Sequence, residues 1–220
     1  MSAQGPLLEW CAIHRHHHKH SDRDGDPHSP WLRAGGWGAM AAGMWHAHVG
    51  WLFARDAGER RPVVADLLAD PVLCVVDRFF WAWMMLGWLA PAMIEGLCLS
   101  SWAAAFHGFL WGGLVRTFLL HHVTWSINSV CHIWGTRVFA TPDHSRNNFL
   151  FGLLALGEGW HNNHHAFPTS ARHGLHRWQI DLTYCVICAM QWCGLVWQVR
   201  VPSGASIAAR RGLAARVLNT

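Results

Sequence analysis

Residues 157–168 read GEGWHNNHHAFP and contain three histidines, His161, His164 and His165. Residues three and four positions apart lie on one face of a helix, so these imidazoles can be directed at one point. Histidine is the commonest metal ligand among the side chains. The stretch therefore predicts a short helix whose histidine face binds a metal ion.

The same spacing occurs near the N-terminus, where the run HRHHHKH (14–20) contains His14, His17 and His18. A single histidine-rich run is also compatible with an adventitious, metal-chelating tail, but a second cluster with the same spacing favours a built site. Asn128 and His132, at i and i+4, add a seventh imidazole. A zinc site usually has four ligands in total, so seven histidines predict two metal ions. Nitrogen-rich ligation suits iron, copper, nickel and zinc alike.

Acidic residues accompany both clusters, with Asp22 after the first and Glu158 just before the second. A metal-bound histidine usually donates its other N–H to a carboxylate or carbonyl, which fixes the orientation of the ring. We therefore predict that Asp22 and Glu158 orient ligands, whereas Asp24 and Asp26 fit a solvated turn equally well. The remaining histidines are interpreted as structural or solvated, except two that are left undecided, His121 and His122.

The composition indicates a protein that faces something other than water. Hydrophobic residues make up 52% of the 220 residues and charged residues only 14%, against about 25% in a typical soluble domain. The chain has 16 tryptophans, and tryptophan favours membrane interfaces. Residues 74–94 and 102–120 are long enough to span a bilayer, which needs about 20 apolar residues. The short linker between them predicts a transmembrane helical hairpin.

These features together predict an all-α integral membrane protein, in which a cytosolic helical cap carries the metal ligands. Positive residues before position 74 place the outer ends of the hairpin in the cytoplasm. We expect five segments: the first cluster and an interfacial segment (1–54), a connector (55–73), the hairpin (74–120), the cap (121–199) and a loosely ordered basic tail (200–220). Residues 180–199 are expected to form an amphipathic or packed helix rather than a third span.

Charge and cysteine content exclude other classes of protein. The net charge of +4 comes largely from arginines in flanks and tail, without the stripe that nucleic-acid binding requires. The seven cysteines show no zinc-finger spacing, and most lie in apolar runs, which indicates small buried residues in a reducing compartment. No signal peptide is recognisable.

Three motifs resemble the stearoyl-type acyl-CoA desaturases, a family of membrane fatty acyl desaturases. HRHHHKHSD (14–22), with DPH (26–28) and HVGW (48–51), resembles the second histidine box and its sequel. TWSINSVCH (124–132) is similar to the segment that supplies one histidine ligand and an asparagine near the metal. GEGWHNNHHAFP (157–168) resembles the third histidine box very closely. The resemblance extends from about residue 5 to residue 199.

The resemblance implies an oxygen-dependent enzyme with two iron ions and dioxygen as co-substrate, which introduces a cis double bond into a saturated acyl chain. Acyl-CoA is the expected substrate and carbons 9 and 10 the expected position. The expected partners are an electron donor, such as cytochrome b5 or a ferredoxin, and the lipid bilayer. The expected location is the bacterial inner membrane or the endoplasmic reticulum, with the metal site on the cytoplasmic face. The implied ligands are the seven histidines above, with Asn128 beside the metal.

The resemblance also implies a first histidine box and two further membrane spans, which residues 1–13 do not provide. We therefore expect a start further upstream or a truncated copy, and a chain of 220 residues that is not by itself a competent desaturase. Two alternatives remain at this point: a related membrane di-iron hydroxylase, and an inactive remnant that retains its metal ligands.

Overall fold

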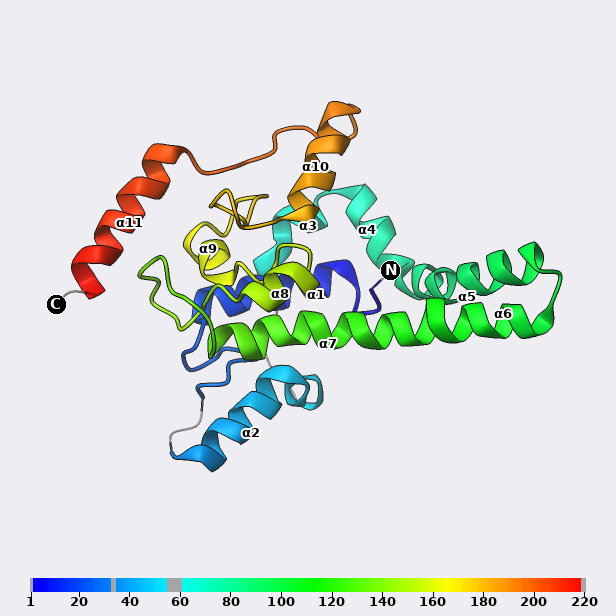
Figure 1. Ribbon diagram of the computed structural model, residues 1–220, viewed down its shortest axis with the longest axis horizontal. Coiled ribbons are helices and arrows are strands. Elements are labelled where there is room, and N and C mark those ends of the chain that lie inside the picture. The colour runs from blue at the N-terminus through cyan, green and yellow to red at the C-terminus, as the bar shows by residue number, and fades with distance from the viewer. Residues whose placement is uncertain (1, 33–34, 55–60, 219–220) are drawn as a thin grey trace. The chain divides into compact units, whose positions relative to one another are not determined.

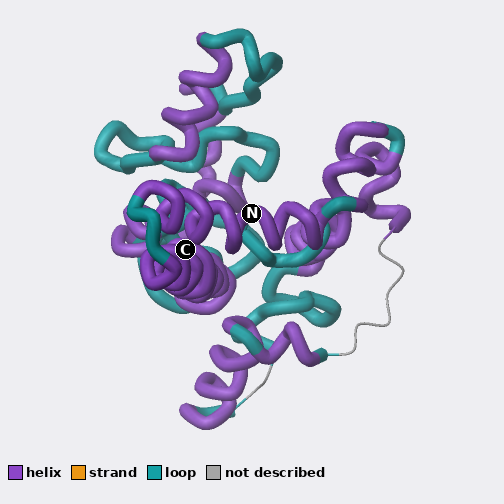
Figure 2. Tube along the Cα trace, turned by 90° about the vertical axis from the view of Figure 1, so that its right-hand side faces the viewer, coloured by secondary structure: helices purple, strands orange, loops and turns teal. Residues whose placement is uncertain are grey.

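The computed structural model describes residues 2–32, 35–54 and 61–218, and these are helices and loops without a strand (Figure 2). Two compact units form, each from two stretches of the chain: residues 1–17 with 55–122, and residues 18–54 with 123–220. The arginines at positions 55 and 60, which are among the positive residues before position 74, lie outside the described residues. The predicted all-α class is confirmed for the described part of the chain.

The first unit is a set of helices whose longest members run antiparallel, joined by the turn at residues 99–101 (Figure 1). It comprises the start of α1 (Leu7–His20), η2 (Arg61–Val64), α3 (Ala65–Leu68), α4 (Pro71–Arg78), α5 (Phe80–Cys98), α6 (Trp102–Gly108), the π-helix η3 (Phe109–Val115) and the start of α7 (Arg116–Ser129).

Local signals fix the ends of these helices. Asp70 caps α4 by accepting hydrogen bonds from the amides of Val72 and Leu73, and Pro71 occupies the first helical position. Ser101 caps α6 in the same way through the amide of Ala104. Asp77 accepts a hydrogen bond of 2.7 Å from the amide of Leu8, which ties the end of α4 to the start of α1.

The stretch predicted as one span, 74–94, consists of two helices. They meet at Phe79 with a bend of 59°. The second predicted stretch, 102–120, belongs to a continuous helical run, Trp102–His132. That run is long and apolar enough to cross a membrane, and the bent pair passes the same test if it is counted as one span.

Glycines allow α5 to pack closely against α6 and η3. A Cβ atom at Gly108 would lie 2.5 Å from the carbonyl oxygen of Pro91, and one at Gly96 would lie 2.7 Å from the Cβ of Ala105. His107 pairs with Glu95 across the same contact, at 2.8 Å. This hydrogen bond agrees with the structural interpretation of His107.

The second unit consists of short helices and loops, and several of these helices carry the histidines. It comprises the end of α1, α2 (Trp37–His48), η1 (Gly50–Phe53), the end of α7, η4 (Val130–His132), α8 (Phe149–Leu154), α9 (His161–Ala166), α10 (Leu182–Trp192) and α11 (Gly204–Leu218). Phe139, Ala166 and Phe167 form its buried apolar cluster, with Ile207 packed against them. At 11 residues, α10 is too short to span a bilayer alone, as expected.

The basic tail was predicted to be loosely ordered, and that prediction is wrong for residues 204–218, which form α11. Arg210 donates a hydrogen bond to the carbonyl oxygen of Ala166, and its guanidinium lies 4.7 Å from the centre of the Phe167 ring. Ile207 adds an apolar contact to the same cluster. The helix is ordered because it covers apolar surface next to α9, which composition alone does not reveal.

We expect Gly108→Ala to destabilise the first unit by about 1–3 kcal/mol, because the new methyl group overpacks against backbone that cannot move freely. Gly212→Ala in α11 is the matched control, since a Cβ there meets nothing within 4 Å. Thermal unfolding of the detergent-solubilised protein should separate the two variants. Equal melting temperatures would show that the contact between α5 and α6 tolerates a side chain at position 108.

Candidate metal centre

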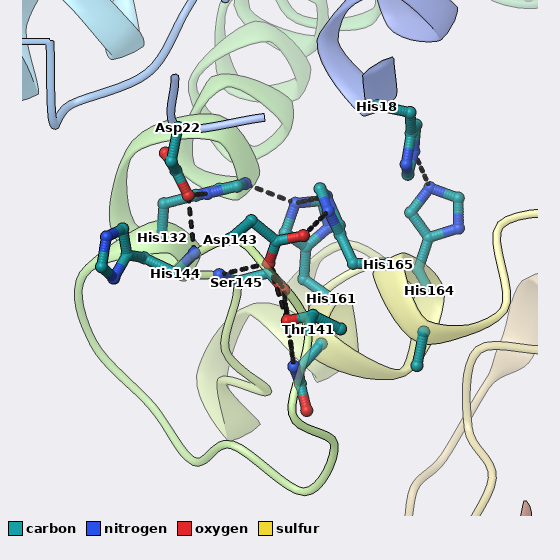
Figure 3. A network of polar contacts seen from close by, with 12 residues as sticks. His18, Asp22, His132, Thr141, Asp143, His144, Ser145, His161, His164 and His165 are labelled. Carbon is teal, nitrogen blue, oxygen red and sulfur yellow. Dashed lines mark hydrogen bonds and ion pairs between the residues drawn. The ribbon is translucent and has the colours of Figure 1, made fainter. Parts of the chain in front are cut away.

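Five histidines from three segments of the second unit lie together (Figure 3). His161, His164 and His165 come from α9, whose first turn places positions i, i+3 and i+4 on one side. His132 ends the helical run at η4, and His18 stands on α1. Segments distant in sequence therefore present their imidazoles to one another.

The five rings form a triad and a pair. In the triad, the Nε2 atom of His161 lies 3.0 Å from Nε2 of His132 and 3.0 Å from Nε2 of His165. The three residues each offer one nitrogen within 4.8 Å of the others. In the pair, the Nε2 atoms of His18 and His164 are 2.8 Å apart.

Two buried carboxylates fix the outer two rings of the triad (Figure 3). Nδ1 of His132 lies 2.8 Å from Oδ2 of Asp22, and Nδ1 of His165 lies 2.9 Å from Oδ2 of Asp143. A carboxylate can only accept, so each Nδ1 carries the proton and each neutral ring keeps its lone pair on Nε2. Both lone pairs point at His161.

This arrangement suits a bound cation. Of the three converging nitrogens, only Nε2 of His161 can carry a proton in neutral rings, and one proton can serve only one of the two 3.0 Å contacts. The other contact sets lone pair against lone pair, which is repulsive unless a positive ion lies between them. The donor set of the triad therefore fits a metal ion.

Electrostatics keep these groups in the forms that a metal site requires. Burial raises the pKa of Asp22, but hydrogen bonds from His132, Ser29 and the backbone of His144 outweigh it and hold the pKa below its usual value. Asp22 is therefore ionised at neutral pH. Burial lowers the pKa of His18 to about 4, so His18 is neutral and its lone pair is available.

The family model for fatty acid desaturases matches residues 1–186 of the chain. The chain belongs to the fatty acid desaturase family. It is 43% identical, over 96% of its length, to a hex-5-enoyl-acyl-carrier-protein acetylenase of Moorena producens (strain JHB). It is 38% identical, over 92%, to a chloroplastic palmitoyl-monogalactosyldiacylglycerol delta-7 desaturase of Arabidopsis thaliana, and 38% identical, over 91%, to an acyl-CoA C20 Delta5-desaturase of Anemone leveillei.

The desaturase chain spans between half and two thirds of the length of these relatives: 66% of the first, 50% of the second and 59% of the third. Members of this family act on fatty acyl substrates as oxidoreductases, and most are associated with membranes. The resemblance to desaturases that the histidine motifs indicated is confirmed. The relatives' names differ in acyl carrier and in double-bond position.

Four predicted site residues of this desaturase-family chain remain: His14, His17, Asn128 and Glu158. His14 and His17 stand on the part of α1 that belongs to the first unit, where the ring of His14 stacks on Trp10 at 4.9 Å. Asn128 is half-buried at the end of α7, and the side chain of Glu158 is exposed after α8. Within the described residues, neither of these two side chains has a hydrogen bond to a histidine of the triad or pair.

Sequence reasoning missed Asp143, because it selected acids by their closeness in sequence to a histidine box. Asp143 stands 22 residues before its partner His165, and only folding joins them. Its local signal is the run TPDHS (141–145), in which the side chain of Asp143 accepts a hydrogen bond from the amide of Ser145 two residues later. That pattern alone indicates a turn rather than a metal site.

The sequence left the surroundings of two further residues open. Asp26 was interpreted as equally suited to a solvated turn, but it is 3% exposed and accepts hydrogen bonds from the amides of Asp22 and His28. His173 was among the histidines interpreted as structural or solvated; it is half-buried, and its ring lies 4.5 Å from that of His164. Burial lowers the pKa of His173. Tertiary contacts therefore enlarge the polar surroundings of the histidines.

We expect Asp22→Asn and Asp143→Asn each to weaken metal binding about 10–100-fold, because an amide no longer fixes the Nδ1–H form of the attached imidazole. Asp24→Asn is the control, since Asp24 is exposed. Glu158→Gln tests the sequence-based assignment of Glu158 in the same assay. Metal titration of the purified protein gives the affinities, and unchanged affinity in Asp143→Asn would contradict the assignment.

Proposed function

We propose that this protein is an oxygen-dependent, di-iron fatty acyl desaturase that introduces a cis double bond into a saturated acyl chain. The proposal is carried by one observation: lone pairs of buried imidazoles converge in a triad, with two tautomers fixed by carboxylates. Membership of the desaturase family supplies the acyl substrate class.

The proposed ligands are all seven predicted histidines: His14, His17, His18, His132, His161, His164 and His165. The triad and the pair support two metal positions rather than one. His14, His17 and His18 stand at i, i+3 and i+4 on α1, so a single helix can contribute to both. When bound, two iron ions supply the oxygen chemistry that removes two hydrogens from unactivated methylene groups.

The residues of this chain hold and orient the groups around that chemistry. Asp22 keeps the Nδ1 proton of His132 in place, and Asp143 does the same for His165, so the Nε2 atoms stay basic. Burial keeps His18 neutral. Asn128 and Glu158 remain proposed neighbours of the site. Exclusion of water by the buried rings protects the reaction from side reactions.

The proposed substrate is an acyl-CoA and the proposed position lies between carbons 9 and 10. The relatives include the acyl-CoA C20 Delta5-desaturase of Anemone leveillei, at 38% identity, and two delta-9 desaturase-like proteins of Arabidopsis thaliana, at 37% and 38% identity. Electrons are proposed to come from cytochrome b5, a ferredoxin or a similar carrier. Assays with one acyl chain on coenzyme A, acyl carrier protein and a glycerolipid will decide the carrier.

His161→Ala should abolish both metal binding at the triad and unsaturated products, because His161 is the ring that faces both fixed lone pairs. Iron content of the purified protein and gas chromatography of fatty acids from a desaturase-deficient host are the measurements. His16→Ala is the control, since His16 stands in the first cluster but outside its i, i+3, i+4 set. If His161→Ala retained its iron and still formed unsaturated products, the proposed site would be wrong. Hydroxylated products from the wild type would favour a hydroxylase instead.

We also propose that the bent pair α4–α5 and the run that begins with α6 cross the bilayer as a hairpin, with the metal site on the cytoplasmic face. Length and apolar composition support this topology. The membrane is proposed to be the bacterial inner membrane or the endoplasmic reticulum.

Cysteine labelling tests this topology in a variant without native cysteines. Asp24→Cys should react with an impermeant thiol reagent from the cytoplasmic side, and Ser100→Cys in the turn between α5 and α6 from the opposite side. Both positions are exposed, so accessibility does not limit labelling. Reaction of both from the same side would rule out the hairpin.

A further inference from the structure

The two residues between His161 and His164 are both buried asparagines. Asn162 is 0% exposed and Asn163 is 2% exposed. In the pattern His-x-x-His-His they would be spacers that set the helical register. A buried amide needs partners for its donors and acceptor, and these two amides face different loops.

The amide of Asn162 has a fixed orientation. Its Oδ1 atom accepts hydrogen bonds of 2.8 Å from the backbone amides of Val138 and Phe139, which can only donate. Its Nδ2 atom is therefore the donor. That atom lies 3.1 Å from the carbonyl oxygen of Phe139, 3.2 Å from Oγ1 of Thr141 and 3.4 Å from Oγ of Ser145.

This orientation sets the direction of the neighbouring hydroxyl groups. Each hydroxyl has one proton, and a hydroxyl oxygen that accepts from Asn162 is free to direct that proton elsewhere. Thr141 donates to Oδ1 of Asp143 at 2.9 Å, and the Ser145 hydroxyl donates to the same oxygen. The Ser145 amide adds a third donor at 3.0 Å. Oδ1 of Asp143 is thus fully engaged, and Oδ2 faces Nδ1 of His165 (Figure 3).

We propose that Asn162 is a positioning residue for the metal centre: its amide orients Thr141 and Ser145 towards Asp143, which keeps the lone pair of His165 on Nε2. The inference rests on the proposed metal-binding function of His165. Asn162 touches no metal ligand through its own side chain in this network. It acts through two hydroxyl groups and one carboxylate.

Asn163 provides an internal comparison. Its Nδ2 donates to the carbonyl oxygen of His173 at 2.8 Å and to Oε1 of Gln179 at 2.9 Å. Its Oδ1 accepts from Nδ2 of Asn147 at 2.8 Å. It is as buried as Asn162 and makes similar bonds, but it reaches neither Asp22 nor Asp143. A purely structural role for both residues predicts the same effect on the metal site.

The test compares Asn162→Asp with Asn163→Asp, two substitutions of equal shape that replace an amide donor with an acceptor. In Asn162→Asp, the new oxygen accepts from the hydroxyl groups and draws their protons away from Asp143. Nitrogen NMR of histidine-labelled, metal-free protein reports the tautomer of His165, assigned with His165→Gln. We expect the Nδ1–H form in the wild type and in Asn163→Asp, and an increased Nε2–H population in Asn162→Asp.

Cobalt(II) titration, followed by its visible absorption, is the second readout. We expect Asn162→Asp to bind Co²⁺ about 10–100-fold more weakly than the wild type, and Asn163→Asp to stay near the wild-type affinity despite a similar loss in melting temperature. Equal effects of the two variants on the tautomer of His165 would overturn the proposal.

If Asn162→Asp does not fold, the double variant Thr141→Val/Ser145→Ala decides the matter, because it removes the same hydroxyl donors without adding a charge. This double variant should also raise the Nε2–H population of His165. An unchanged tautomer of His165 would contradict the proposal that the two hydroxyl groups act on Asp143. Failure of the proposed function has a different signature: the wild type itself would bind no Co²⁺, while the tautomer of His165 would still respond to Asn162→Asp.

Discussion

The hydrogen bond between a buried carboxylate and Nδ1 of an imidazole is the interaction on which the candidate site depends. It occurs twice, from Asp22 to His132 and from Asp143 to His165. An imidazole that donates from Nδ1 presents its lone pair at Nε2. Without these two bonds the rings could turn or change tautomer, and the convergence at His161 would be lost. The geometry of the candidate site therefore depends on a layer of carboxylates that surrounds the imidazoles.

That layer is built from loops rather than from the helices that carry the histidines. Asp22 follows the end of α1 and also accepts from the hydroxyl of Ser29 and the amide of His144. Asp143 lies in a loop that Asn162 fastens to α9. Each loop would be free to move if its polar groups faced water. Burial makes an unpaired polar group costly, so satisfied networks of this kind hold one arrangement.

The two units are built from different kinds of residue. The first unit supplies long apolar helices that pack through glycine contacts such as Gly108 against Pro91. The second supplies buried imidazoles and carboxylates, with α11 covering the apolar surface beside α9. In each unit, close packing and the hydrogen bonds of polar side chains act together, because neither alone would fix one arrangement of the side chains.

The sequence by itself determined the helical class, the histidine spacing and the family, because helical periodicity and ligand spacing are local properties of a chain. It also selected Asp22, which accepts a hydrogen bond from His132 in the structure. Only the tertiary structure decided that Asp143 faces His165, that Asn162 is more than a spacer, that the predicted span 74–94 bends at Phe79 and that the basic tail forms a packed helix. These features depend on contacts between residues far apart in sequence, and composition and spacing carry no information about which distant loops meet.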